Sequence, residues 1–208
     1  VGISTDGTIT GVSVSGSVNG TEKVGGITGS SEDTTVKQVA TAVSVSGNVD
    51  VGGVIGANEV EADLTEATAT GRVDGERSVG GLTGWNSGFG DVVASSGLAT
   101  VTGNENVGGL VGHNEQGGVL DHSFTSSEVD GRSVAGGLVG LNDGTITKSY
   151  WNKTSTTVGV GDGEKGGTAL KAQQMQGETA TTAMGALDFE STWTVVTDPP
   201  EYPVHAWQ

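Results

Sequence analysis

The sequence predicts an all-β fold, namely a parallel β-solenoid (β-helix) of five to six coils with a repeat of about 28 residues. A short block of the form Val-Gly-Gly-x-x-Gly returns along the chain at nearly constant spacing. Apolar residues alternate with small or polar ones inside each unit, which is the period of a strand and not of a helix. Glycine contributes 38 residues and proline only 3, as expected of a chain with many tight turns.

The repeated block gives the strongest signal in the sequence. Its copies are 27, 28, 28 and 28 residues apart, starting at Val24, Val51, Val79, Val107 and Ala135. A unit of this length cannot bury its apolar side alone and has to stack on its neighbours. Like residues of successive units should therefore lie over one another and form a continuous core.

Two details of the repeat can be compared with a structure. The leucines of three successive blocks, Leu82, Leu110 and Leu138, should form one contiguous column. The stretch from Ser30 to Gly47 departs from the pattern, so one coil is expected to bulge or to be shortened there. Departures of this kind in single repeats are candidate binding faces.

The composition suits a narrow core. Apolar residues are 33% of the chain and aromatic residues 4%, which is little for a conventional globular core but enough for a column lined by Val, Ile, Leu and Ala. The chain has no cysteine, so disulfides and thiolate metal sites are excluded. Stability must come from stacking.

The charge is strongly acidic. Nine basic and 25 acidic residues give 9 − 25 = −16, a charge that repels nucleic acid and anionic membrane surfaces. Salt screens such self-repulsion, so the balance favours a halophilic source, with an ordinary acidic secreted protein as the alternative. No apolar run approaches membrane-spanning length, so direct membrane insertion is not expected in this segment. The sequence begins within its pattern and without a signal peptide, which suggests a piece of a longer protein.

Two sets of residues recur in step with the repeat. Stacked amides can hydrogen-bond along a solenoid, so a structural ladder is predicted from Asn58, Asn86, Asn114 and Asn142. The residue before each of the last three asparagines differs from coil to coil. This row is a candidate binding face, with packing as the alternative, and consists of Trp85, His113 and Leu141.

Acidic residues that follow a repeated valine offer a weak calcium hypothesis at Asp50, Asp74 and Asp130. Calcium takes six to eight oxygen ligands, and the sequence lacks the known calcium-loop patterns, so aspartate as a turn former is the alternative. Otherwise no cofactor is expected. Sequons at Asn19 and Asn152 are weak candidates for glycosylation.

Catalytic residues are not apparent. The three histidines, His113, His122 and His205, have no partner at metal-ligand spacing and are expected at the surface. Asp121 with His122, and Asp91 one coil earlier, could place two carboxylates on one face as glycosidases require, but acidic residues are abundant enough for chance proximity. We therefore expect no enzyme.

The repeat stops after residue 157. Residues 1–157 are predicted to form the solenoid and residues 158–208 a small C-terminal cap with a short helix near "TALKAQQMQG". The cap contains Phe189, Trp193, Tyr202 and Trp207, a large share of the aromatic residues. It should cover the apolar core and the free strand edges of the last coil, and an aromatic ligand site is the alternative.

Several of these segments resemble a known family. "GTITKSYWN" at 144–152 and the repeated "VGGLVGxN" are similar to GLUG repeats of bacterial and archaeal surface proteins, and "LKAQQMQG…ALDFESTWTVV…YPVHAWQ" looks like the segment that closes such arrays. The resemblance implies a right-handed, extracellular β-solenoid module of adhesin-like proteins and no defined reaction. The early stretch "SSEDTTVKQVATAVSVSG" lacks the "GTI…SY" form.

The functional expectation is a non-enzymatic structural or adhesive module, extracellular or on the cell surface, of a halophilic archaeon. Its partners would be a surface glycan or protein, or neighbouring copies of itself, and not nucleic acid. Two alternatives stay open. One is a carbohydrate-active β-helix enzyme, by analogy of fold alone. The other is a filament subunit that assembles through the solenoid ends.

Overall fold

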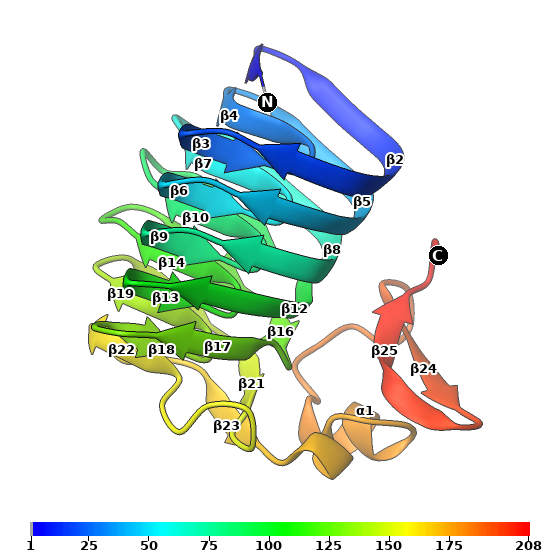
Figure 1. The fold of residues 1–208 in the computed structure, drawn as a ribbon. Coiled ribbons are helices and arrows are strands. Elements are labelled where there is room, and N and C mark those ends of the chain that lie inside the picture. Colours follow the sequence, from blue (N-terminus) through cyan, green and yellow to red (C-terminus); the bar gives the residue numbers. More distant parts are fainter. Residues whose placement is uncertain (1) are drawn as a thin grey trace.

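The computed structural model describes residues 2–208, without the side chain of Pro200, and shows the predicted β-solenoid of about five coils (Figure 1). The coils stack along one axis, and successive coils add strands to three parallel sheets. Helix is confined to a 3-10 turn at Ala172–Gln174 and to α1 at Thr179–Ala183 among the described residues. None of the described helices is long and apolar enough to cross a membrane.

The sheets contain seven, eleven and five parallel strands. The seven-stranded sheet comprises β1 (Ile3–Thr5), β4 (Thr28–Glu32), β7 (Ile55–Glu59), β10 (Thr83–Asn86), β14 (Val111–Asn114), β19 (Val139–Asn142) and β22 (Val160–Gly163). The eleven-stranded sheet comprises β2 (Thr8–Asn19), β5 (Thr35–Ser46), β8 (Asp63–Asp74), β11 (Asp91–Val93), β12 (Ser96–Gly103), β15 (Val119–Asp121), β16 (Phe124–Thr125), β17 (Glu128–Gly131), β20 (Thr145–Thr147), β21 (Tyr150–Asn152) and β23 (Thr168–Leu170). The five-stranded sheet comprises β3 (Glu22–Gly25), β6 (Val49–Gly52), β9 (Arg77–Gly80), β13 (Glu105–Gly108) and β18 (Ala135–Gly136).

The register reproduces the sequence repeat. The backbone N–H of Leu82 donates to the carbonyl of Leu110, and that of Leu110 donates to Leu138, both at 2.9 Å. All three leucines are fully buried in one core cluster. The predicted column is therefore confirmed, and the core is continuous because each coil covers the apolar side of the next.

The expectation of a bulged coil between Ser30 and Gly47 is wrong. β5 pairs with β2 on one side and with β8 on the other along its whole length, with Val45 opposite Val73. The two Val-Asp pairs at 49–50 and 73–74 look alike in sequence but occupy different strands, β6 and β8. Backbone pairing and the inward valines set the register.

Corners of the coils are formed in two ways. One column of left-handed residues runs along the sheet at the start of its long strands, namely Gly11, Gln38, Glu66, Ala94, His122 and Lys148, with φ between 42° and 67°. The Gly-Gly pairs serve a different purpose, because a Cβ at Gly81 would lie 2.2 Å from the carbonyl oxygen of Gly109. Glycine is needed there for close approach between coils rather than for a left-handed backbone.

The solenoid extends past residue 157. β22 pairs with β19, and β23 pairs with β21, so parallel pairing continues to Leu170. The indole of Trp151 packs against the end of the core, where a Cβ at Gly137 or Gly159 would approach that ring to 2.7 Å. Trp151 and the loop that follows it therefore close this end.

Residues 171–208, which we call the arm, pack against the side of the solenoid, whereas the sequence predicts that they cover its end. The arm ends in an antiparallel hairpin of β24 (Trp193–Thr197) and β25 (Pro200–His205) beside the eleven-stranded sheet (Figure 1, orange to red). The cause lies in one outward column of that sheet, where Thr68 and Ser96 are followed by Phe124 and Tyr150. These two aromatic residues share a buried cluster with the arm.

Candidate functional site

The predicted row of Trp85, His113 and Leu141 exists on the outer face of the seven-stranded sheet. The three residues are direct neighbours on β10, β14 and β19, and all are partly exposed. Ala57 precedes them in the same row and Asp162 follows. Successive coils thus present a small, an aromatic, an imidazole, an aliphatic and an acidic side chain at one position.

A polar cluster fixes the N-terminal part of this row. The Nζ atom of Lys23 lies 5.9 Å from the centre of the Trp85 ring and 2.6 Å from Oε2 of Glu59. The hydroxyl of Ser30 donates to the same carboxylate oxygen. The cation is thereby held near the indole, where a cation–π contact is favourable.

An exposed aromatic residue beside the row was missed by the sequence reasoning. Phe89 follows β10 in the corner of its coil and is 70% exposed, and Val60 in the preceding corner is 51% exposed. The phenyl ring lies against Gly117 of the next coil, where a Cβ would be 3.0 Å from it. The signal was the apolar residue within the turn sequence "SGFG" at 87–90.

The four repeated asparagines form a buried hydrogen-bonded ladder, in agreement with their spacing. Each Nδ2 atom donates to the Oδ1 atom of the next coil at 2.8–2.9 Å, through Asn58, Asn86, Asn114 and Asn142. The same amides donate to turn carbonyls, for example Asn86 to Gly90 at 2.8 Å. Within the described residues, Oδ1 of Asn58 and Oγ of Ser31, which precedes it in the column, accept or donate no hydrogen bond.

A second ladder of serines was not predicted. The backbone N–H of Ser95 donates to Oγ of Ser123 at 3.0 Å, and that of Ser123 donates to Oγ of Ser149 at 3.3 Å. Each hydroxyl in turn donates to the carbonyl two residues earlier. Serine recurred at 28- and 26-residue steps, but it is too common in this chain for that spacing to be noticed.

The carboxylate face differs from its predicted form. Asp91 lies opposite Asp63 and Val119, whereas Asp121 lies opposite Val93, so the two predicted carboxylates are not in one row. Burial raises the pKa of Asp91, and repulsion from Asp63 and Asp121 adds to the effect.

The environment of Asp121 is opposite in its effect. Partial burial acts to raise the pKa of Asp121, but hydrogen bonds from Thr147 and His122 outweigh it and hold the pKa below its ordinary value. Nδ1 of His122 lies 2.6 Å from the Asp121 carboxylate. The face therefore combines one carboxyl group that ionises late with one that ionises early.

The predicted calcium residues are not brought together. Asp74 and Asp130 lie in one row but are separated by Thr102, while Asp50 belongs to another sheet. Arg72 also occupies both carboxylate oxygens of Asp74 at 2.6 Å. The error has the same origin as the misplaced coil, since the residue equivalent to Asp74 is a serine of β5. No group of three or more acidic, histidine or cysteine side chains placed to hold a metal ion occurs among residues 2–208.

The two sequons differ in accessibility. Asn19 is exposed at the end of β2. Asn152 is only 5% exposed, and its Oδ1 accepts hydrogen bonds from the N–H and the hydroxyl of Thr154. Its Nδ2 donates to Ser126 at 3.0 Å. The prediction of a glycosylation site at Asn152 is therefore wrong for the folded chain.

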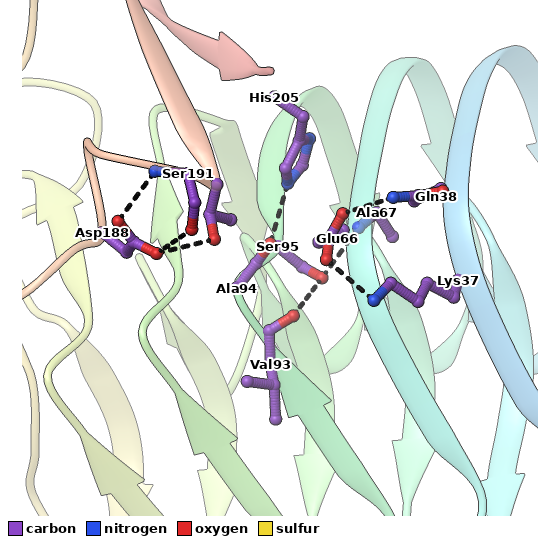
Figure 2. A network of polar contacts seen from close by, with 11 residues as sticks. Lys37, Gln38, Glu66, Ala67, Val93, Ala94, Ser95, Asp188, Ser191 and His205 are labelled. Atoms are coloured by element: carbon purple, nitrogen blue, oxygen red, sulfur yellow. Dashed lines mark hydrogen bonds and ion pairs between the residues drawn. The ribbon is translucent and has the colours of Figure 1, made fainter. Parts of the chain in front are cut away.

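His205 is buried, in contrast to the surface position predicted for it. Its Nε2 atom is 2.8 Å from the carbonyl oxygen of Ala94 and its Nδ1 atom 3.0 Å from Oγ1 of Thr68, so it fastens the arm to the solenoid (Figure 2). The ring stacks on Trp193 with centroids 4.0 Å apart. Burial lowers the pKa of His205, while the Ala94 carbonyl and the charge of Glu66 act in the opposite direction.

Glu66, in the same corner column as Ala94, belongs to its own network (Figure 2). Lys37 lies 3.1 Å from one carboxylate oxygen and Gln38 donates to the other at 3.0 Å. Partial burial acts to raise the pKa of Glu66, but these two partners outweigh it and lower the pKa. The remaining group drawn there, Asp188, accepts hydrogen bonds from Ser191 and the backbone of the turn before β24.

Comparisons with known proteins agree with this architecture. The model of the GLUG motif matches residues 103–129, so the expected resemblance is confirmed over one coil. A solved structure of a candidate immunoglobulin A1 protease from Bacteroides ovatus is similar, with a TM-score of 0.61 and 17% identity over 99% of this chain and 75% of that chain. At this identity the likeness concerns the fold. No curated protein matches the sequence.

Proposed function

We propose that this chain is a non-enzymatic β-solenoid module of a secreted or cell-surface protein from a halophilic microbe, an archaeon by its acidic composition. It serves as a rigid support that presents one variable outer row to a surface glycan or protein. The GLUG motif and the solenoid fold are consistent with such a module. No cofactor has a role in this proposal.

The contrast between inner and outer columns carries the proposal. Inside the coil, leucine follows leucine and asparagine follows asparagine at the same position. Outside, the row that contains Trp85 and His113 changes its chemistry at every step. Packing alone favours repetition in stacked coils, so a row that differs in each coil is better explained by recognition.

The chemistry of the surface suggests the kind of partner. Trp85 and the 70% exposed Phe89 offer aromatic faces, and the pairs of Lys23 with Glu59 and His113 with Asp143 offer polar groups beside them. Aromatic side chains flanked by polar groups are enriched where proteins bind partners. The acidic net charge favours neutral or basic partners over polyanions.

Binding to a glycan array and to intact cells tests the proposal. We expect Trp85→Ala and Phe89→Ala each to weaken binding by about tenfold, the effect of losing ~1.4 kcal/mol at an aromatic contact. The matched control is Val158→Ala, which truncates a 48% exposed apolar side chain elsewhere. Equal binding by all three variants would place recognition on another surface.

An enzyme remains the second candidate, because the carboxylate face pairs a late-ionising Asp91 with an early-ionising Asp121. Opposite shifts of two nearby carboxyl groups are typical of acid–base pairs. Product release is measured with neutral and acidic polysaccharides and, given the fold neighbour, with immunoglobulin A1. Our proposal predicts no turnover, and turnover lost in both Asp91→Asn and Asp121→Asn would refute it.

A further inference from the structure

The N-terminal end of the solenoid differs from its C-terminal end. Among the described residues, β1, β2 and β3 pair on one side only, at the ends of their sheets. β2 has 12 residues, whereas the outermost strands at the other end, β18, β20, β22 and β23, have two to four. Short edge strands are a common protection against association, and β2 lacks this protection.

β2 also lacks the other usual protections. Its sequence, TITGVSVSGSVN, contains no charged residue and no proline. Its inward Val12, Val14 and Val18 pack on the core clusters but remain partly exposed, and Ile3 beside them is 75% exposed. A hollow of about 290 Å³ opens at this end between β1 and β3. The core that Trp151 closes at the other end is therefore open here.

The charge at this end permits two copies to meet. Residues 1–25 carry Asp6, Glu22 and Lys23, so their sum is 1 − 2 = −1 out of −16. The remaining −15 lies on residues 26–208, where contact between copies would be repulsive. Stacking of one copy's N-terminal end on another's C-terminal end is also disfavoured, because Trp151 and its loop close that end.

We propose that the N-terminal end binds a second copy of this chain about a two-fold axis, with the two β2 strands paired antiparallel. The axis keeps inward side chains facing inward, so Val14 must lie opposite Val14 or Val12 of the partner. Any register shifted by one residue would put valines against the exposed Ser13 and Ser15. The contact uses the same patch of both copies and closes on itself, so it yields a dimer and no filament.

The size of the end face sets the expected strength. A coil of 28 residues at about 3.3 Å per residue has a perimeter of about 90 Å, so two facing ends bury roughly 1,000 Å². This is the lower limit of specific interfaces, so dissociation constants in the micromolar range or weaker are expected. Salt should strengthen the dimer by screening the charge of the two bodies.

Sedimentation velocity of the 208-residue chain, from about 1 µM to about 1 mM at about 0.1 M and 2 M NaCl, tests the proposal. We expect dimers that increase with concentration and with salt. The double variants Ser13→Lys/Ser15→Lys and Ser13→Asp/Ser15→Asp place like charges against themselves across the axis. Each should dimerise at least about tenfold more weakly, and an equimolar mixture of the two should form a heterodimer.

The matched control is Ala42→Lys/Ser44→Lys, which adds the same charge to exposed positions of β5, one coil away from the edge. It should dimerise like the parent chain. Thermal unfolding of every variant separates lost association from lost folding. A parent chain that stays monomeric at the highest concentration and salt overturns the proposal, as do longer polymers, or a mixture of the two charge variants that stays monomeric.

Discussion

Asn86 makes three hydrogen bonds from a fully buried side chain. Its Nδ2 atom donates to Gly90 and Asn114, and its Oδ1 atom accepts from Asn58. Asn86→Ala would leave the Gly90 carbonyl and two neighbouring amides without these partners, so we expect a loss of about 2–4 kcal/mol in the free energy of unfolding. Chemical denaturation measures this loss. The exposed Asn104 gives the control, since Asn104→Ala should change stability by less than about 0.5 kcal/mol.

The ladder is incomplete at its N-terminal end. Ser31 stands where the next four coils have asparagine, and Oδ1 of Asn58 has no donor among the described residues. An amide at this position could donate to that oxygen, so Ser31→Asn should stabilise the fold by about 0.5–1.5 kcal/mol. The gain should vanish in an Asn58→Ala background. Destabilisation by Ser31→Asn alone would mean that the coil has no room for the longer side chain.

At this scale the sequence predicts a residue well only where spacing and chemistry agree. The asparagine ladder was predictable because an amide both donates and accepts along a stack. The serines at 95, 123 and 149 obey the same spacing but resemble many other serines. The anchoring of His205 was not predictable, since its partner Thr68 lies 137 residues away in the chain.

The arm is the element in which buried titration and packing are combined. Above pH 6.5, the ordinary pKa of histidine, both folded and unfolded chains hold the His205 ring neutral, so this group contributes no pH dependence. Below it the unfolded chain binds a proton that the buried ring resists, because burial lowers its pKa. The free energy of unfolding should therefore fall as the pH is lowered from about 6.5 through the pKa of the folded state.

Unfolding at a series of pH values checks this prediction. His205→Gln should remove part of the slope below pH 6.5, whereas His122→Gln, at the partly exposed surface, should preserve the contribution of the arm. Identical slopes in the parent chain and in His205→Gln would show that the arm does not respond to acid. Glu66 faces the ring and counteracts the effect, so Glu66→Gln should make the slope steeper.

Elements were predicted where inward residues alternate in long strands, as in β8. Failure came from two local likenesses. Val49-Asp50 resembles Val73-Asp74, yet strand pairing assigns them to different sheets. The arm was expected to cover an end because its aromatic residues needed a partner. That partner proved to be Phe124 and Tyr150, whose outward direction follows from the register of the whole sheet.

For the whole molecule, the acidic charge opposes the compact state. The charge of −16 is spread over a narrow rod, and Asp63, Asp91 and Asp121 repel one another on one face. We expect the melting temperature to rise by about 5 °C or more between about 0.1 M and 2 M NaCl. Asp91→Asn should raise stability at low salt and weaken the salt dependence. A melting temperature independent of salt would exclude a large electrostatic penalty.

The fold as a whole was predictable because a repeat fixes the architecture once its period is known. A single coil of 28 residues implies parallel pairing, an inner column and an outer row. The outer row could be located but its partner could not be identified, because recognition depends on side chains that the repeat leaves free to vary.

The attachment of the arm determines how the molecule would respond to tension. The chain leaves the solenoid after β23 and runs back along its side, so residue 208 lies beside coils formed much earlier (Figure 1). Pulling at this residue would peel the hairpin away one contact after another, starting at the stacked imidazole of His205. The coils would bear the load only afterwards, which makes the arm a mechanical fuse for the rod.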